Sequence, residues 1–369
     1  MTRQRLGVAL VGSGVISHNH ARAIERLDRL RIVAIVDPDP AATARLAETV
    51  TGPPPARYGG LSAALDDGDV EVVVVCTPTG THTELAAAAL AAGRHVIVEK
   101  PLDATLPAAR DFVAVARAAA DRGQLVTVIS QHRFDPATVA VRQSIVDGTL
   151  GRPTSAVASV AWWRGQDYYD SAAWRGTWAL DGGGALMNQG IHTVDLLVWL
   201  LGRPVEVSAR TARLAHEGIE VEDVAVATVA FASGALAVLH ATTAAWPGLA
   251  VRLQVHGTAG SAVIHDDQLE YFGTGPGNRA PDLVPAGEAR GTAKPADSFV
   301  IGHWRQYVDI VEAIDTGRPS GVSAEDAVAA MAVVRAVYES AALGRAVAVD
   351  DVLAGGYDPD GGSLDPPTG

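Results

Sequence analysis

The sequence predicts an α/β protein with a doubly wound parallel sheet at the N-terminus, followed by an α/β domain built on a large, mostly antiparallel open sheet. Its 369 residues are too many for one ordinary core. The first third alternates short apolar runs with helical patterns, which is typical of a parallel sheet. Beyond residue 133, runs that alternate apolar and polar residues indicate antiparallel strands. We expect domains over residues 1–130 and 131–350, and a disordered tail over residues 355–369.

Apolar runs place the N-terminal strands at residues 6–11, 31–36, 70–75, 95–98 and 124–129. The run at 70–75 is nearly all β-branched, as expected of a strand buried on both faces. Helical spacing places the intervening helices at residues 17–27, 41–49, 61–66, 83–92 and 106–122. Residues 52–55 (Gly-Pro-Pro-Pro) cannot continue a helix and indicate a loop.

The C-terminal domain is expected to contain strands at residues 154–162, 205–214, 223–231, 235–246, 251–256 and 262–264. Helices are expected at residues 136–147, 190–201, 303–315 and 324–343. The Gly/Pro-rich residues 273–295 indicate an exposed loop.

Composition excludes several classes of function. The formal charge of -13 argues against non-specific nucleic-acid binding, which needs a basic surface. Cys76 is the single cysteine, so no intrachain disulfide forms and a reducing cytoplasmic location is expected. No uncharged run is long enough to cross a bilayer, so we expect no membrane partner.

A glycine loop between the first strand and the first helix suggests a dinucleotide site. Glycine lets the backbone approach a pyrophosphate, and the helix N-terminus offers free N–H groups. The loop reads Gly12-Ser13-Gly14-Val15-Ile16, and Ser17 stands where the fingerprint has a third glycine. Asp37 ends the second strand, where a carboxylate accepts from ribose hydroxyls and repels a 2′-phosphate, which favours NAD over NADP. Alternatively, Asp37 belongs to a turn of helix-capping aspartates.

Polar residues also follow the third strand, at the edge of the sheet that binds ligands. Thr77, Pro78 and Thr79 are candidates to line the cofactor ribose. His82 either contacts the cofactor or packs at the start of the next helix. Cys76 is expected to be a small buried residue rather than a nucleophile.

Two distant segments make chemical sense together. Glu99-Lys100-Pro101 puts an ammonium at the carboxyl end of the fourth strand. Residues 181–195 bring the carboxamide of Asn188 and the imidazole of His192 on a glycine-rich segment that opens an apolar helix. The preceding glycines suggest close approach of a ligand. With the glycine loop, these segments suggest a nicotinamide site acting at an alcohol carbon.

On these motifs the sequence resembles the glucose–fructose oxidoreductase, inositol dehydrogenase and rhizopine catabolism protein family (Gfo/Idh/MocA) over nearly its whole length. The resemblance implies a Rossmann domain followed by an α/β domain whose open sheet often forms the oligomer interface, hence a homodimer or homotetramer. It also implies a sugar or polyol substrate.

The resemblance further implies roles for the motif residues. It places Glu99 and Lys100 beside the cofactor, with Lys100 stabilising an alkoxide and the Lys100–Pro101 peptide cis. His192 is the expected general acid/base. Many family members have aspartate where this chain has Asn188, and an amide can position a hydroxyl but cannot act as a base. Asp195 either orients His192 or favours the helix dipole.

An aromatic and basic segment precedes the glycine-rich one. Rings stack on sugar faces and arginines bind carboxylates or phosphates, so substrate contacts are expected there. The candidates are Arg164, Tyr168, Tyr169, Trp174 and Arg175. An oligomer interface is the alternative, since it favours the same residue types. Further pocket candidates are Gln131, His132, Arg133, His303, Trp304 and Tyr307.

The leading hypothesis is an NAD(H)-dependent oxidoreductase that transfers a hydride between nicotinamide and a secondary alcohol or ketone of a sugar, inositol or sugar nucleotide. One alternative is a glycoside hydrolase that oxidises its substrate transiently through NAD. Another is a non-catalytic NAD(P)-binding regulator, which the retained Lys100 and His192 disfavour and Asn188 favours. No metal is expected, because the sequence has no cysteine cluster and no H-E-x-x-H motif.

Overall fold

The computed structural model describes residues 4–284 and 298–356. The chain divides into two compact units, each treated by itself below. The first comprises Met1–Asp103, Ala108–Gln131 and Pro295–Ala327, and the second comprises Ala104–Pro107, His132–Lys294 and Val328–Gly369. The described chain thus returns to the first unit with residues 298–327. The predicted tail lies outside the described residues from position 357 onward.

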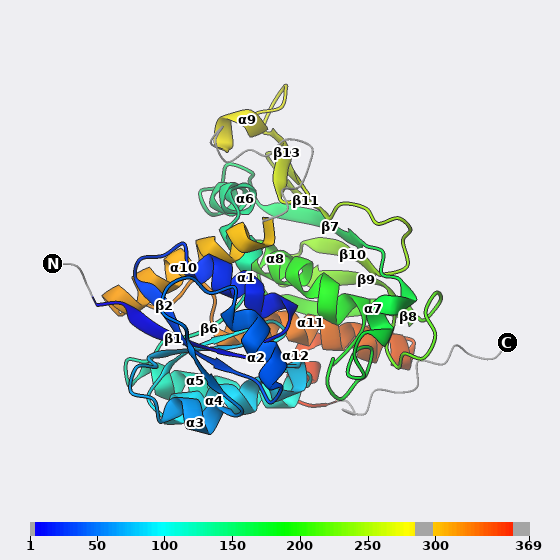
Figure 1. The fold of residues 1–369 in the computed structure, drawn as a ribbon. Coiled ribbons are helices and arrows are strands. Elements are labelled where there is room, and N and C mark those ends of the chain that lie inside the picture. The colour runs from blue at the N-terminus through cyan, green and yellow to red at the C-terminus, as the bar shows by residue number, and fades with distance from the viewer. Residues whose placement is uncertain (1–3, 285–297, 357–369) are drawn as a thin grey trace. The chain divides into compact units, whose positions relative to one another are not determined.

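The first unit is built on a six-stranded parallel sheet with the order β3-β2-β1-β4-β5-β6 (Figure 1). Its strands are β1 (Leu6–Val11), β2 (Leu30–Val36), β3 (Ala56–Tyr58), β4 (Val72–Val75), β5 (His95–Val98) and β6 (Val126–Val128). Every residue of β1 and β4 is buried, as their apolar runs predict for a sheet covered on both faces. The short edge strand β3 was not predicted, because three residues carry no periodicity.

Helices cover both faces of this sheet. They are α1 (Val15–Ile24), α2 (Pro40–Ala47), α3 (Leu61–Leu65), α4 (His82–Ala91), α5 (Leu106–Ala120) and α10 (Ser298–Thr316). Figure 1 shows α1 and α10 side by side on one face, with α4 and α5 on the other. Helix α10 closes a core of β-strand side chains with Tyr307 and Ile310. It therefore completes the unit although it comes from far along the chain.

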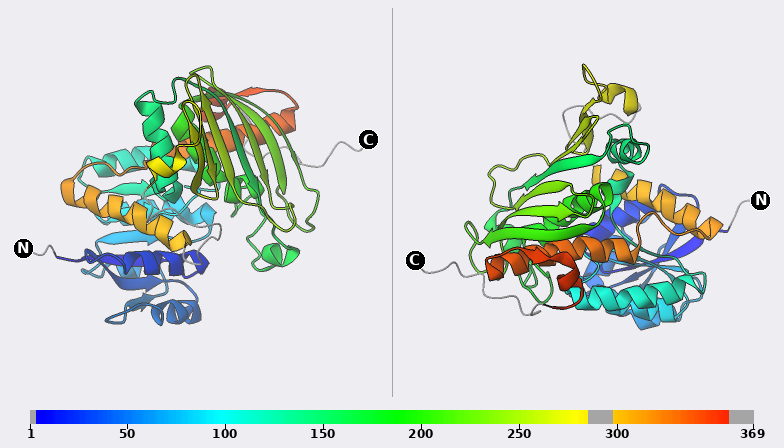
Figure 2. Two further views of the ribbon diagram at one scale, coloured as in Figure 1. Left: turned by 90° about the horizontal axis from the view of Figure 1, so that it is seen from above. Right: turned by 180° about the vertical axis from the view of Figure 1, so that it is seen from behind.

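The second unit contains an eight-stranded sheet with the order β13-β12-β11-β7-β10-β9-β8-β14. Figure 2 shows this open sheet in two further views. The strands are β7 (Pro153–Ala161), β8 (Pro204–Ala212), β9 (Val224–Phe231), β10 (Leu236–Thr242), β11 (Arg252–Gly257), β12 (Ser261–His265), β13 (Gln268–Gly273) and β14 (Val347–Ala348). All pairs are antiparallel except β7 with β10. The predicted fold class is therefore confirmed for both parts of the chain.

The helices of the second unit include one that opens with an irregular turn. They are α6 (Pro136–Val146), α7 (Gln166–Asp170), α8 (Ile191–Leu201), α9 (Ala280–Leu283), α11 (Ala324–Leu343) and α12 (Val349–Leu353). A π-helical turn, η3 (Leu186–Gly190), leads directly into α8. A Cβ on Gly190 would lie 3.1 Å from that of Ala241 in β10, so small residues let this turn lie against the sheet.

The two faces of the second sheet differ. In β10, Ala237, Leu239 and Ala241 are buried, whereas Leu236 and Val238 are exposed. Val157 of β7 pairs with Val238 and is exposed as well. Side chains alternate between faces along a strand, so one face carries the helices and the other presents exposed valines and leucine.

Parts of the C-terminal prediction were wrong. Helix α9 and strand β13 fall within or beside the segment predicted as a loop, of which residues 285–295 lie outside the described residues. Strand β10 ends at Thr242 rather than residue 246, and Trp246–Pro247 is cis. The two-residue strand β14 is too short to be detected from sequence. No helix among residues 4–284 and 298–356 has the length and apolar character needed to span a bilayer.

Candidate functional site

In the first unit, the glycine loop joins β1 to α1. Gly12 has φ +94°, and a Cβ there would lie 2.6 Å from the carbonyl oxygen of Cys76, the residue after β4. Only glycine therefore lets the loop pass this close to the end of β4. Gly14 is the N-cap of α1 with no side-chain cap, and nothing lies within 4 Å of the place its Cβ would take. Gly12 therefore serves internal packing, whereas Gly14 leaves open space before the N–H groups of the helix.

The loop suits an anionic dinucleotide in two further respects. The Ser13 hydroxyl is buried without a hydrogen-bond partner in the described structure, and an incoming phosphate oxygen would satisfy it. Val15 is 82% exposed at the first helical position, although it is apolar. Ser17, at the third glycine position, donates from Oγ to the Gly12 carbonyl at 2.6 Å and thereby locks the loop.

Asp37 faces the same loop from the end of β2. Its Oδ2 accepts from the Ser13 N–H at 2.8 Å, and its Oδ1 accepts from the Asp39 N–H at 2.9 Å. Asp39, not Asp37, is the N-cap of α2 and accepts from the Ala41 N–H. The helix-capping role therefore belongs to Asp39, whereas Asp37 is fixed beside the glycine loop.

The segment after β4 is held by His82. Its Nδ1 lies 2.8 Å from the Pro101 carbonyl oxygen, and its Nε2 lies 2.8 Å from that of Thr77. The ring is buried, and burial lowers its pKa despite these two carbonyls. His82 thus bridges the Thr77–Pro78 and Lys100–Pro101 segments, and in its neutral form its single N–H donates to one of the two carbonyl oxygens. Burial also raises the pKa of the Cys76 thiol well above its usual value, which confirms an inert buried cysteine.

Lys100 follows β5, and its peptide bond to Pro101 is cis, as predicted. The preceding carboxylate, Glu99, is buried and holds the segment by accepting from the Lys100 N–H at 2.9 Å through Oε2. Its Oε1 lies 2.9 Å from His20 Nε2 and 3.2 Å from His303 Nε2. Burial alone would raise the pKa of Glu99, but the two histidines outweigh it and bring the pKa well below its usual value.

This buried cluster was missed by the sequence analysis. His20 is on α1, and its Nδ1 lies 2.8 Å from the Tyr307 hydroxyl of α10. Burial lowers the pKa of His20, so a neutral ring donates through Nε2 to Glu99 and accepts through Nδ1 from Tyr307. His303 and Tyr307, proposed as pocket residues, are buried here instead. The sequence signal for this cluster was His20, a histidine on the helix that follows the glycine loop.

In the second unit, the glycine-rich segment has a different role from the predicted one. A Cβ on Gly182 would lie 2.7 Å from the Ala104 Cα, one on Gly183 would lie 2.3 Å from the Tyr338 hydroxyl, and one on Gly184 would lie 1.7 Å from the Glu222 carbonyl oxygen. The inference that these glycines admit a ligand was therefore wrong. They admit the protein's own backbone and side chains.

Glu222 holds this segment through hydrogen bonds to its backbone. Its carboxylate accepts from the Gly184 and Leu186 N–H groups, both at 2.8 Å, and from the Tyr338 hydroxyl at 3.2 Å. It is fully buried, and burial raises its pKa to about 7 against the effect of these hydrogen bonds. A titratable group thus fixes the turn that leads into α8.

Asn188 lies on the π-helical turn with its amide held in one orientation. Its Nδ2 donates to Asp181 Oδ1 at 2.8 Å and to the Gly183 carbonyl oxygen at 3.1 Å. Asp181 is buried and also accepts from the Gly176 N–H at 2.8 Å through Oδ2. The amide oxygen, an acceptor, is the opposite end of this fixed group.

His192 lies in the first turn of α8, beside a histidine that sequence analysis weighed only as a further pocket candidate. The rings of His192 and His132 meet edge to face with centroids 5.2 Å apart. His132 Nδ1 is 2.8 Å from Asp135 Oδ2 and 3.2 Å from Asp267 Oδ1. Burial alone would lower the pKa of His132, but the two carboxylates raise it to about 10. His192 therefore adjoins an imidazolium at neutral pH.

The hairpin between β12 and β13 delivers Asp267 to this place. Asp266 and Asp267 have φ values of 50° and 67°, the left-handed pair of a two-residue hairpin turn. Non-glycine residues adopt this region at some cost, and aspartate does so more readily than most. The Asp-Asp pair between two short apolar runs was the sequence signal for this contact.

Asp195, on α8, is bound by an arginine of the segment that follows β6. Arg133 binds it through a buried bidentate pair, with Nε–Oδ2 at 2.8 Å and Nη2–Oδ1 at 2.6 Å. The guanidinium also lies 5.5 Å from the ring centroid of Trp199 on α8. This pair fixes the segment that carries His132 against α8.

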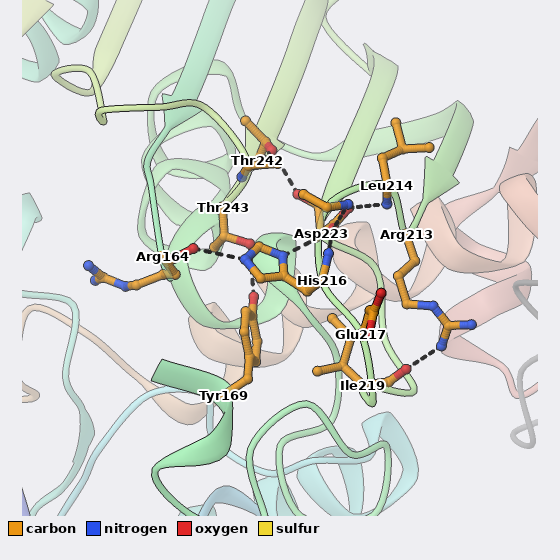
Figure 3. Close-up of polar contacts among 12 residues, drawn as sticks. Arg164, Tyr169, Arg213, Leu214, His216, Glu217, Ile219, Asp223, Thr242 and Thr243 are labelled. Atoms are coloured by element: carbon orange, nitrogen blue, oxygen red, sulfur yellow. Dashed lines mark hydrogen bonds and ion pairs between the residues drawn. The ribbon is translucent and has the colours of Figure 1, made fainter. Parts of the chain in front are cut away.

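A second buried network supports the aromatic segment (Figure 3). The Asp223 carboxylate accepts from three successive N–H groups, Leu214 to His216, and lies 3.0 Å from His216 Nδ1. His216 Nε2 lies 2.8 Å from the Arg164 carbonyl oxygen. Tyr169, a predicted substrate contact, is buried and bonds to Thr243 at 2.8 Å. Sequence analysis gave His216 no role.

Two groups of potential metal ligands occur in the described part of the chain: His20 with Glu99 and His303, and His132 with Asp135 and Asp267. In both, each histidine lies within hydrogen-bond distance of a carboxylate. The expected absence of a metal stays a prediction.

Comparison with known proteins agrees with this architecture. Residues 6–130 match the family model for the oxidoreductase family with an NAD-binding Rossmann fold, and residues 138–263 match the model for the Gfo/Idh/MocA C-terminal domain. Inositol 2-dehydrogenase of Rhizobium meliloti is 28% identical over 92% of this chain and 98% of that protein. The 1,5-anhydro-D-fructose reductase of Ensifer adhaerens is 31% identical over 78% of this chain and 82% of that protein.

Among solved structures, the WlbA dehydrogenase of Bordetella pertussis in complex with NADH and UDP-GlcNAcA is similar, with a TM-score of 0.83 and 29% identity. The match covers 94% of this chain and 99% of that one. Sequence and structure thus agree over both units. The chain belongs to the Gfo/Idh/MocA family and is an oxidoreductase with an NAD-binding Rossmann fold.

Proposed function

We propose that the protein oxidises a secondary hydroxyl of a sugar, inositol or sugar nucleotide with NAD, or reduces the matching ketone. The observation that carries this proposal is the setting of His192. An imidazole that opens α8 adjoins a fixed imidazolium and follows an amide whose orientation is locked. The names of the relatives reported above, which act on or bind a polyol, an anhydro sugar and a nucleotide sugar, support the substrate class.

Residues of the first unit are proposed to hold the cofactor. Residues 12–16 would face the pyrophosphate, Asp37 the adenosine ribose, and residues 77–79 the rest of the dinucleotide. When bound, NAD supplies a two-electron acceptor for the carbinol carbon. Two hydrogen bonds already hold the Asp37 carboxylate beside the loop, where its charge opposes a 2′-phosphate. Dissociation constants for NADH and NADPH test this; tighter NADPH binding contradicts the assignment of Asp37.

Three residues of the chain have separate proposed roles at the substrate hydroxyl. Lys100, held by Glu99 and the His82 bridge, donates hydrogen bonds to the substrate oxygen and stabilises its negative charge. Asn188 accepts a hydrogen bond from the hydroxyl through its amide oxygen and orients it. His192 takes the proton, and the adjacent His132 cation favours the neutral, basic form of its ring.

A substrate panel tests the proposal. Sugars, inositols and their ketones are assayed for NADH formation or consumption, and matched glycosides are assayed in parallel for sugar release. Turnover of a polyol with stoichiometric NADH is the expected result. Sugar release without net NADH would favour the hydrolase, and cofactor binding without any turnover would favour the regulator.

We also propose that the open face of the second sheet joins copies of the chain into a homodimer or homotetramer. The exposed Val157 and Val238 lie side by side on paired strands, flanked by exposed Leu236 and Val226. The mass in solution tests this: Val238→Lys is expected to dissociate the assembly, and a monomeric wild-type protein would contradict the proposal.

A further inference from the structure

The segment before the glycine-rich region gathers two arginines around one tyrosine. The guanidinium carbon of Arg164 lies 5.1 Å from the ring centroid of Tyr168, and that of Arg175 lies 4.3 Å from it. Each arginine also contacts a tryptophan, Arg164 with Trp162 at 5.2 Å and Arg175 with Trp174 at 4.6 Å. The aromatic rings thus hold two positive charges about the same tyrosine.

Neither charge is neutralised within the part of the chain that the structure describes. No carboxylate lies within ion-pair distance of Arg164 or Arg175 there, although the chain carries a net charge of -13. Arg175 Nε donates to the neutral Ser171 hydroxyl at 3.1 Å. The Nε of Arg164 is buried and has no acceptor among the described residues. A buried N–H of a charged group without an acceptor is costly, so this donor favours an acceptor oxygen brought by a ligand.

The backbone of Arg164 is held in place from beneath. The Asp223–His216 pair anchors the Arg164 carbonyl oxygen, and Arg164 N–H donates to the Thr243 carbonyl oxygen at 2.9 Å. Figure 3 shows the guanidinium extending away from this buried network. The Arg164 guanidinium therefore extends from a backbone segment that hydrogen bonds hold in place.

The pair is also connected to the segment that carries Asn188. The hydroxyl of Tyr168 lies 3.3 Å from Nε2 of Gln189, the residue next to Asn188. Gln189 is only 7% exposed, and its Oε1 has no hydrogen-bond partner among the described residues. Gln189, which connects Tyr168 to the segment of Asn188, thus carries a second buried polar atom without a partner among the described residues.

We infer that Arg164 and Arg175 form a subsite for an oxyanion carried by the substrate, a carboxylate or a phosphate group. A guanidinium presents a planar fork of donors that matches either group, and stacking on aromatic rings orients that fork at little entropic cost. This inference narrows the proposed substrate class to sugars or polyols that carry a carboxylate or phosphate group. The inference rests on the proposed function, because the same substrate reaches Asn188 and His192.

Binding measurements test the subsite separately from turnover. With NADH saturating, D-glucuronate, D-glucose 6-phosphate and neutral D-glucose are titrated by calorimetry into the wild-type protein. We expect at least one anion to bind about tenfold or more tightly than glucose, with an advantage that shrinks as salt is added. The glucuronate and phosphate arms decide which oxyanion the fork prefers.

Arginine variants then locate the effect. Arg164→Gln and Arg175→Gln are each expected to weaken anion binding about ten- to hundredfold and to leave glucose binding unchanged. Arg203→Gln is the control, because Arg203 is an exposed arginine of the same unit that pairs with Asp350. Sedimentation of each variant detects a change of oligomeric state.

The outcomes separate this inference from the proposed function. Equal affinity for anions and glucose, anion affinity that survives both substitutions, or variants that change the assembly and not anion binding would each overturn the subsite. Anion binding that depends on both arginines, with no NADH formed from any panel substrate, would keep the subsite and refute the oxidoreductase proposal.

Discussion

The imidazole rings of His132 and His192 meet edge to face, with centroids 5.2 Å apart and ring planes at 86°. His132 is held by Asp135 and Asp267, which raise its pKa to about 10 against the effect of burial, so it is charged at neutral pH. A buried Arg133–Asp195 pair lies on the same segments and balances its own charge. Because its ring is in direct contact with that of His192, we expect the His132 cation to oppose a second positive charge there.

Removing the charge of His132 is expected to move the pH profile. His132→Phe keeps a ring beside His192 but removes the cation, so the acidic limb of kcat/KM should shift about one pH unit higher. Asp267→Asn suits the left-handed turn and removes a negative charge, so it should shift the limb lower or leave it unchanged. Shifts of both variants in the same direction would show a structural effect instead.

Replacing His192 itself tests proton transfer. His192→Ala should lower kcat at least about a hundredfold, because the general base is lost. NADH affinity should be unchanged, since the proposed cofactor residues lie in the first unit. His240→Ala is the control, a partly buried histidine of β10 that bonds to Ser159. A near-normal kcat for His192→Ala would refute the assignment.

Asn188 is expected to resist replacement by the aspartate that many relatives carry. Its amide nitrogen lies 2.8 Å from Asp181 Oδ1, so Asn188→Asp would put two carboxylates in contact. We expect a loss of about 3 kcal/mol in unfolding free energy at pH 8 and a smaller loss at pH 5, where the pair shares a proton. The exchange Asp181→Asn with Asn188→Asp should recover part of the stability. Denaturant unfolding measures both, and a stable single variant would contradict the explanation.

Glu222 should make stability depend on pH. Burial raises its pKa to about 7, above the ordinary 4.5, so the folded state retains a proton that the unfolded state releases. Its contribution is present below about pH 4.5 and is lost as pH rises through about 7, by roughly 3 kcal/mol. Glu222→Gln mimics the protonated form and should lose less stability between pH 5 and 8 than the wild type. The exposed Glu206→Gln is the control, and parallel curves for wild type and Glu222→Gln would disprove the effect.

Two N-cap glycines of the first unit offer a matched test of cofactor placement. Gly14 caps α1 and Gly60 caps α3, and a Cβ at either position would meet nothing within 4 Å. Both alanine variants should therefore fold with little change in melting temperature. Gly14→Ala should weaken NADH binding at least about tenfold, because the methyl group occupies space meant for the pyrophosphate, whereas Gly60→Ala should not. Equal NADH affinity in both variants would place the dinucleotide elsewhere.

The sequence by itself determined the fold class, the parallel strands, the glycine loop and the motif residues. These depend on local signals: apolar runs, helix-breaking glycines and short motifs whose spacing is fixed along the chain. The cis Lys100–Pro101 peptide was predicted on the same basis, through resemblance to the family.

Tertiary structure alone decided what surrounds those residues. It showed that Gly182–Gly184 make room for Ala104, Tyr338 and Glu222, and that Asp267, more than seventy residues from His192, charges the histidine beside it. It also gave His216 its place beneath Arg164. Such contacts join residues far apart in sequence, and a single chain carries no periodicity or spacing that records them. Their effects on charge and orientation follow from distances, which only the folded chain defines.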